Sequence, residues 1–239
     1  MMETILEVKS LEKTYGDSFT LGPVDFVIGK GETVGLLGKN GAGKSTFFQL
    51  VTGSLDADSG EILLSSEPLT PDTFMLKRNL GYLPQDLQLP KWATVVELLE
   101  YAAKLYQLEN AKQKIEHAIN HWACETFVNR PLAACSHGMQ KRAALALATL
   151  HTPKLLILDE PFSGLDLYHI RALETAVEWR SQNGFATIIC THIAPYAAKL
   201  CSKIYVLEQG SMSSLANWEE KPYIEKIARI EQYFFQEDD

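Results

Sequence analysis

The sequence predicts an α/β fold, in which a sheet of buried strands is joined by crossover helices. Short apolar runs that end at turn or acidic residues are typical of strands buried on both faces, and they occur at 33–37, 154–158, 185–190 and 203–207. Residues 3–9 and 24–28 alternate as further strands do. Helical patterns lie between these segments, at about 44–53, 94–122, 138–151, 166–182 and 218–235. This alternation of strands and helices favours an α/β core.

The composition is that of an ordinary globular protein, with 46% hydrophobic and 22% charged residues among 239. The net charge of -8 disfavours general nucleic-acid binding, because neutralising phosphates requires clustered Lys and Arg. The four cysteines have no CxxC spacing, so we expect reduced thiols rather than disulfides or a zinc site. The sequence shows no secretion signal and no run of 18 or more apolar residues. We therefore expect a cytoplasmic protein.

We expect a single domain over residues 1–239, since the sequence has no internal repeat, low-complexity segment or long linker. The stretch from about 86 to 150 holds several helical patterns and no convincing strand, which predicts an inserted helical sub-domain there. The C-terminal helix, at about 218–235, carries Ile224, Ile227 and Ile230 on one stripe. This stripe favours packing on its own domain, with support of a dimer as the alternative.

The segment "GLLGKNGAGKST" predicts a phosphate-binding loop, because it fits G-x-x-x-x-G-K-[ST] between an apolar strand and a helix. Its glycines allow backbone N–H groups to surround phosphates at the positive end of the helix dipole. Lys44 would neutralise the β- and γ-phosphates, and the Ser45 hydroxyl would bind Mg²⁺. The expected ATP-binding residues of the loop are Gly38, Lys39, Asn40, Gly41, Ala42, Gly43, Lys44, Ser45 and Thr46.

Two adjacent acids end a second buried strand in "LLILDEPFSGLD". Ligands of open α/β sheets bind at the carboxyl ends of the strands, so both acids would lie at that edge. Asp159 is placed to hold the shell of a Mg²⁺ ion. Glu160 is placed to orient or deprotonate an attacking water.

With both motifs in place, the chain resembles the ATP-binding subunit of an ABC transporter over essentially its full length. The resemblance implies a P-loop NTPase core of ABC type, with a mixed sheet, flanking helices, an antiparallel β sub-domain and an inserted helical sub-domain. It implies that Tyr15 in "KTYGD" stacks on adenine and that Gln85 in "GYLPQD" reaches Mg²⁺ and the water. It also implies that His192 in "IICTHI" contacts the γ-phosphate, so that the catalytic set is Glu160, His192 and Lys44.

The stretch "CSHGMQKR" stands where the family has its signature, usually written LSGGQ. Ser136 and Gly138 match, and their hydroxyl and amide could bind a γ-phosphate at the start of a helix. Asp166 in "SGLD" matches the loop that crosses between two ATPase subunits, with Gly164 where Ala is usual. The resemblance implies that two subunits pair head to tail, most simply as a homodimer, with each ATP between one phosphate loop and the opposite signature turn.

The same stretch also permits a nucleophilic enzyme, with Cys135 or Ser136 as nucleophile and His137 as base. Neighbours in sequence rarely reach attacking geometry, and no orienting acid or G-x-S-x-G turn accompanies them. The phosphate-binding interpretation is therefore favoured.

We expect an ATPase that hydrolyses MgATP to drive a separate integral membrane permease, which would hold it at the inner face of the cell membrane. Export is the favoured direction, because Met139 gives the turn the Ser-x-Gly-Met form of many export-type subunits. Trp92, Tyr101 and Tyr106 would suit a groove for a permease helix or belong to the core of the helical sub-domain. The alternative is a soluble ABC ATPase that acts on nucleic acid or the ribosome; the single, unsplit, acidic chain disfavours it.

Overall fold

A six-stranded mixed sheet forms the centre of the computed structural model, which describes residues 3–16 and 18–235. In the order β10-β9-β3-β8-β7-β6, its strands are Ser211–Ser214, Lys203–Glu208, Thr33–Leu37, Ala186–Cys190, Leu155–Asp159 and Leu80–Leu83. The strands from β9 to β6 pair in parallel, whereas β10 is antiparallel to β9. All residues of β3, β7 and β8 are buried, as parallel strands covered on both faces require. The four apolar runs are confirmed as strands.

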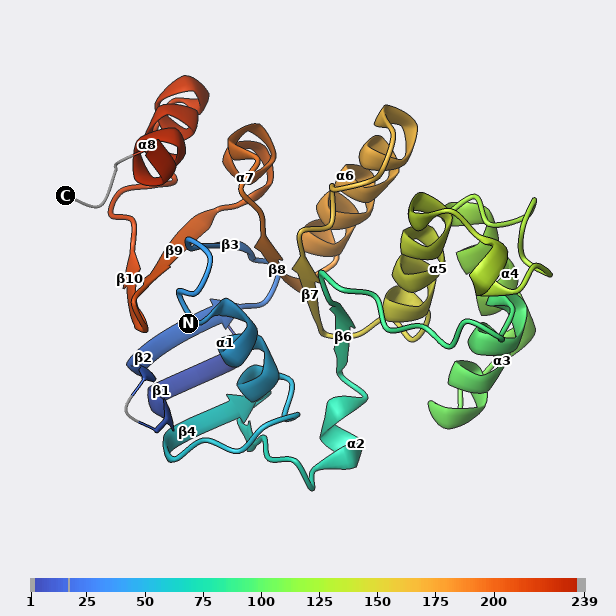
Figure 1. Cartoon of the computed structure of the whole chain (residues 1–239), viewed down its shortest axis with the longest axis horizontal. Helices are drawn as coiled ribbons and strands as arrows, with labels where there is room; N and C mark the ends of the chain where they lie inside the picture. The colour runs from blue at the N-terminus through green and yellow to red at the C-terminus, as the bar shows by residue number, and fades with distance from the viewer. Residues whose placement is uncertain (1–2, 17, 236–239) are drawn as a thin grey trace.

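A second sheet of four antiparallel strands, in the order β2-β1-β4-β5, lies below the first in Figure 1. Its strands are β1 (Thr4–Tyr15), β2 (Phe19–Gly29), β4 (Ser59–Leu64) and β5 (Glu67–Pro68). The predicted strands at 3–9 and 24–28 are present and longer than expected, because β1 and β2 continue as one long hairpin. The expected α/β fold, with a mixed sheet and an antiparallel sheet, is confirmed.

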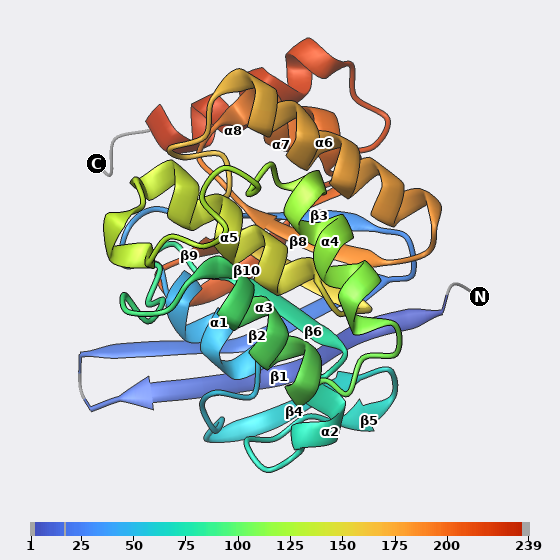
Figure 2. The same ribbon diagram turned by 90° about the vertical axis from the view of Figure 1, so that its right-hand side faces the viewer.

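The antiparallel sheet covers one face of the central sheet, and helices cover the opposite face (Figures 1 and 2). Figures 1 and 2 show α6 (Leu167–Gln182), α7 (Ala194–Leu200) and α8 (Tyr223–Phe235) on one side, and the antiparallel sheet with α1 (Lys44–Val51) on the other. The hydrophobic core is divided accordingly. Side chains of β7 alternate between the two faces, so that Leu156 and Leu158 join the helical core while Leu155 and Ile157 join the core beneath.

The prediction of one helix over 94–122 is wrong. The segment forms α3 (Val95–Leu105) and α4 (Ala111–His121), separated by a turn in which Gln107 and Asn110 have φ of 52° and 53°. Left-handed backbone conformations end a helix, and the apolar periodicity continues across the break without revealing it. The turn η1 (Leu132–Ala134) and α5 (His137–Thr149) follow, with no strand between 86 and 150 in this fully described segment. An inserted sub-domain over 86–150 stays a prediction.

The last helix, α8, packs against α7, as favoured from the sequence. Ile230 is fully buried and Ile227 packs against the same core, whereas Ile224 is 77% exposed. The prediction of an apolar stripe is therefore correct for Ile227 and Ile230 but not for Ile224. The elements β4, β5, β6, β10, α2 (Phe74–Lys77) and α7 had no sequence prediction of their own.

Helix α3 begins with a capping box that supports a direct stability test. The Thr94 hydroxyl accepts the Glu97 N–H at 3.3 Å, and the Glu97 carboxylate accepts the Thr94 N–H at 2.8 Å. Thr94→Ala should lower the free energy of unfolding by about 1 kcal/mol, because it leaves a helix N–H without its acceptor. Denaturant unfolding measures the change. Thr126→Ala, at an exposed threonine outside the helices, is the matched control; equal stability of the two variants would contradict the assignment.

Candidate nucleotide-binding site

The loop between β3 and α1 contains the predicted phosphate-binding residues. Gly41 and Gly43 have φ of 82° and 107°, a left-handed conformation that glycine adopts without steric penalty. A Cβ on Gly38 would lie 2.7 Å from the carbonyl oxygen of Leu207, so this position also excludes a side chain. The loop curls at the N-terminus of α1, where free N–H groups and the helix dipole favour an anion. Lys39, Asn40, Ala42, Ser45 and Thr46 lie in the loop or in the first turn of α1.

The Lys44 ammonium folds back over this loop. Its Nζ donates to the main-chain oxygens of Gly38 at 2.6 Å and Lys39 at 2.9 Å. Among the described residues, no carboxylate lies within ion-pair distance of it. The positive charge is therefore held beside the loop and available to a phosphate.

Asp159 ends β7 as a buried acid, 5% exposed. Its Oδ1 makes no hydrogen bond within the described part of the chain. Burial raises the pKa of Asp159 and the negative charge of Glu160 adds to the rise, while the Cys190 thiol and the charge of Lys44 act in the opposite direction. A buried carboxylate oxygen without a donor is a suitable ligand for a divalent cation, so the site fits Mg²⁺.

Glu160 and His192 are in direct contact, because they follow the adjacent parallel strands β7 and β8. Glu160 Oε1 accepts hydrogen bonds from the His192 main-chain N–H at 3.1 Å, and His192 Nδ1 lies 2.9 Å from the same oxygen. The Thr191 hydroxyl donates to Oε2 at 3.3 Å. Glu160 itself has a φ of 47°, which turns its side chain away from the strand direction. The predicted general base and its histidine are thus brought together.

A cleft of about 480 Å³ joins these parts. The predicted residues that line it are Gly38, Lys39, Asn40, Lys44, Gln85, Glu160 and His192. Four further lining residues were not predicted: His137, Lys141, Ser163 and Phe234. Phe234 comes from α8, so the end of the last described helix forms one wall of the cleft. No local sequence pattern could have placed it there, because the contact is formed across most of the chain.

Lys141, which was not predicted as a site residue, is a buried cation beside the cleft. It is 2% exposed, and its Nζ donates to the main-chain oxygens of Glu160 and, at 3.0 Å, Ser163. Burial lowers the pKa of Lys141, against the attraction of Glu160 and Asp159. The ammonium therefore links α5 to the turn that follows β7 and supports the left-handed backbone of Glu160. Its position in "MQKR" resembles an ordinary surface cation, which is why the sequence did not reveal it.

The stretch Cys135–Gly138 is organised around a helix start. The Ser136 hydroxyl caps α5 by accepting the Met139 N–H at 3.3 Å. Cys135 is buried, and its thiol donates to the main-chain oxygen of Pro131. No hydrogen bond joins Cys135 or Ser136 to His137 among the described residues. This geometry supports a phosphate-binding turn and gives no support to a nucleophile and base.

Ser136, Gly138 and Asp166 line a second concavity, of about 240 Å³, and not the cleft of the phosphate loop. Asp166 caps α6, with its Oδ1 accepting the His169 N–H at 3.0 Å and lying 2.7 Å from His169 Nδ1. The His169 N–H is the main cause of the lowered pKa of Asp166. The predicted site residues therefore fall into two separate hollows of one chain.

Tyr15 lies at the end of β1, outside both hollows, and is 41% exposed. Phe19, its partner across the hairpin, lies closer to the phosphate loop, since a Cβ on Gly43 would meet its Cζ at 2.7 Å. The adenine-stacking role of Tyr15 stays a prediction, with Phe19 as the neighbouring aromatic.

Comparison with known proteins identifies the family. The chain matches the ABC transporter family model over residues 21–163. It belongs to the ABC transporter family. It is 30% identical to the linearmycin resistance ATP-binding protein LnrL of Bacillus subtilis, over 88% of this chain and 68% of that protein. It is also 30% identical to the Nod factor export ATP-binding protein I of Rhizobium sp. (strain N33), over 88% of this chain and 70% of that protein.

The similarity to solved structures supports the same family assignment. A solved structure of the ATP-binding subunit of an ABC transporter superposes with a TM-score of 0.85 at 28% identity, covering 95% of this chain and 99% of that chain. The protein is thus an ABC ATPase that binds ATP, and the predictions of family, fold class and ATPase activity are confirmed. None of the helices in residues 3–16 and 18–235 has the length and apolar character needed to span a bilayer.

Two departures of this ABC ATPase from the usual family pattern complement each other. A Cβ on Gly164 would lie 2.9 Å from His137 Cδ2, a distance that Cβ atoms do not tolerate. A Cβ on Gly138 would similarly lie 2.8 Å from the Gly164 carbonyl oxygen. The His137 imidazole therefore occupies the space that the methyl group of the usual alanine would need at position 164.

Gly164→Ala should slow ATP hydrolysis several-fold, because the added methyl group separates the signature turn from the loop of Asp166. The double variant His137→Gly/Gly164→Ala should recover part of the rate. Recovery stays incomplete, since alanine at the φ of +75° costs about 1 kcal/mol. Measuring kcat and KM for ATP with the thermal midpoint of all three variants forms a double-mutant cycle. Additive effects would show that the two positions are independent.

Proposed function

We propose that this ABC ATPase hydrolyses MgATP to drive a separate membrane permease that exports its cargo. The single observation that carries the proposal is the cleft in which the phosphate loop, Gln85 and the Glu160–His192 pair converge. The names of two relatives, one a resistance protein and the other an export protein, support export as the direction.

In this proposal, water attacks the γ-phosphate in line from the side of Glu160. The bond from the γ-phosphorus to the bridging oxygen breaks, and ADP leaves on the opposite side. The Glu160 carboxylate orients the water and receives its proton, while His192 holds that carboxylate and faces the γ-phosphate. Lys44 exchanges its two main-chain contacts for phosphate oxygens and neutralises the developing charge. Lys141 is a positioning residue, because its hydrogen bonds to the main-chain oxygens of Glu160 and Ser163 hold Glu160 in place.

Mg²⁺ would be held by Ser45, Asp159 and Gln85, together with oxygens of the nucleotide. The orphaned Oδ1 of Asp159 is the observation that fits this role. The described residues contain no group of three or more His, Cys, Asp or Glu side chains that could bind a metal alone. This agrees with the way Mg²⁺ is usually bound, through one or two carboxylates and the substrate's phosphates. Bound Mg²⁺ would supply charge neutralisation at the β- and γ-phosphates.

A second ATPase subunit would complete the site. Ser136, Gly138 and Asp166 line a hollow distinct from the phosphate-loop cleft, so one chain offers two half-sites. In a head-to-tail homodimer, each nucleotide would be enclosed by the cleft of one subunit and the signature turn of its partner. The Ser136 hydroxyl accepts from Met139 N–H and keeps its own proton to donate to a γ-phosphate.

The permease would dock beside the helices that follow β6. Trp92 and Tyr101 are 81% and 67% exposed, so they are available to a partner. Tyr106 stacks on His151, with ring centroids 4.0 Å apart, and lines a groove of about 390 Å³. An amphipathic permease helix in this groove would press on the segment that carries Gln85.

Glu160→Gln should abolish the general base and lower the ATP hydrolysis rate by about 100-fold or more. ATP binding should persist, because the loop and Lys44 are untouched, and an ATP-bound dimer should accumulate in gel filtration. Glu116→Gln, at an exposed acid outside both hollows, is the matched control. An unchanged hydrolysis rate in Glu160→Gln would refute the role of Glu160.

Affinity purification from detergent-solubilised native membranes should recover the protein with a membrane protein of many spans. Tyr101→Glu should reduce that recovery, because it places a charge in the docking surface, whereas Thr126→Ala should not. Purified protein is then assayed for ATP hydrolysis with DNA and with ribosomes. Stimulation by either, without a membrane partner, would favour the non-transport alternative.

A further inference from the structure

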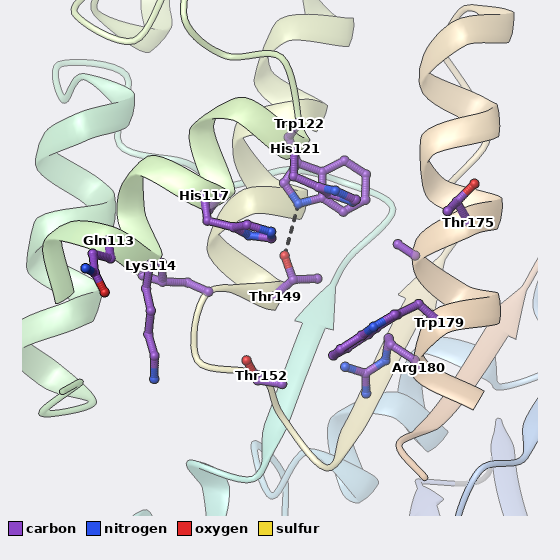
Figure 3. Close-up of a pocket in the computed structure, with 13 residues that line it drawn as sticks. Gln113, Lys114, His117, His121, Trp122, Thr149, Thr152, Thr175, Trp179 and Arg180 are labelled. Atoms are coloured by element: carbon purple, nitrogen blue, oxygen red, sulfur yellow. Dashed lines mark hydrogen bonds between the residues drawn. The ribbon is translucent and has the colours of Figure 1, made fainter. Parts of the chain in front are cut away.

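A second cavity of about 490 Å³ lies away from the nucleotide cleft, between α4, the end of α5 and α6. Figure 3 shows Trp179 and Arg180 reaching from α6 toward the side chains of α4. Its volume is close to the 480 Å³ of the nucleotide cleft and falls in the range of small-molecule sites. None of the predicted ATP-binding or catalytic residues lines it.

The charged side chains of this cavity are all basic. Lys114 and Arg180 line it together with His117 and His121, and no aspartate or glutamate does. Partial desolvation lowers the pKa of His121, and the neighbouring His117 adds to the fall. The lasting positive charge therefore comes from Lys114 at the exposed edge and Arg180 in the interior.

Arg180 is a buried cation without an acid partner among the described residues. It is 3% exposed, and its three hydrogen bonds go to neutral oxygens, of Thr187, Pro153 and Ala186. Desolvation lowers its pKa to about 10. Two acids of the same helix, Glu174 and Glu178, pair with Lys199. A buried charge without a counter-ion is unfavourable, and an anion in the cavity would relieve it.

The walls between these charges are apolar and aromatic. Trp122 is 1% exposed, and its ring N–H already donates to the Thr149 hydroxyl at 3.0 Å, so the ring backs the cavity wall without a free polar group. Trp179 is 50% exposed and stacks on Phe185, with ring centroids 5.8 Å apart. Figure 3 places the Trp122 and Trp179 rings on opposite sides of the space. A flat or aliphatic body would be covered on both sides.

We propose that this cavity binds a small organic anion with an apolar body, with its anionic group toward Arg180 and Lys114 and its body between Trp122 and Trp179. Guanidinium groups bind carboxylate and sulfonate oxygens through parallel N–H donors. The ligand would contact α4 and α6 together, and so join the helical segment before the signature turn to the helix that Asp166 caps. If Arg180 served only to bind strand-end carbonyls, neither the cavity nor the basic edge would be needed.

The test uses 8-anilinonaphthalene-1-sulfonate as the probe and N-phenyl-1-naphthylamine as its uncharged analogue, on the full chain with saturating ADP to fill the nucleotide cleft. The sulfonate probe should bind with at least tenfold higher affinity than the amine. Arg180→Met should remove that difference by lowering affinity for the sulfonate probe about tenfold. Because Arg180→Met also leaves carbonyls unpaired, Lys114→Gln is measured beside it and should lower the affinity several-fold.

Matched controls locate the probe. Lys112→Gln, on an exposed lysine of the same helix that does not line the cavity, should leave the affinity unchanged. Trp179→Phe should reduce energy transfer from tryptophan to the probe, whereas Trp92→Phe, outside the cavity, should not. Equal binding of the two probes, or affinity for the sulfonate probe that is unchanged in both Lys114→Gln and Trp179→Phe, would overturn the proposal.

Discussion

The parallel pairing of β3, β8 and β7 is the constraint on which the rest of this structure depends. In that register Leu36 of β3 lies beside Cys190 of β8, and Asp159 of β7 lies beside the same cysteine. The phosphate loop, the acid pair and His192 each follow one of these strands, so a single sheet edge collects them. All residues of these three strands are buried, so the sheet that sets this edge is covered on both faces.

Features formed by residues close together in the sequence could be predicted, whereas contacts between distant segments could not. The glycine loop and the two acids could be predicted because each needs specific residue types within a few positions. Lys141 could not be predicted, because its partners are backbone oxygens 19 and 22 positions away, and any buried chain segment offers such oxygens. The break between α3 and α4 was lost for a related reason. Left-handed conformations at Gln107 and Asn110 change the chain direction without changing the apolar period.

Burying a cation costs free energy, and Lys141 and Arg180 are both buried cations with different surroundings. Each is a buried cation that lacks a carboxylate within ion-pair distance in the described part of the chain and is bound by neutral oxygens. Lys141 faces the nucleotide cleft beside Asp159 and Glu160, whose charges attract it. No aspartate or glutamate of the described residues lines the space beside Arg180, which is basic and walled by aromatic rings. Burial alone therefore does not distinguish a positioning cation from a binding cation, but the surrounding charges do.

The phosphate-loop cleft and the hollow of Ser136 and Asp166 are separate because different helix N-termini form them. Ser136 caps α5 and Asp166 caps α6, so both side chains point along the N-terminal ends of helices whose free N–H groups face outward. The phosphate loop lies at the N-terminus of a third helix, α1, which opens toward the cleft. In the proposed function, the γ-phosphate of an ATP bound at α1 would gain further N–H and hydroxyl donors if another helix N-terminus approached it. Within one chain, Ser136 and Asp166 line a different hollow, although His137 at the start of α5 lines the cleft. In the proposed homodimer, the Ser136 hydroxyl of the second copy would supply the missing donor.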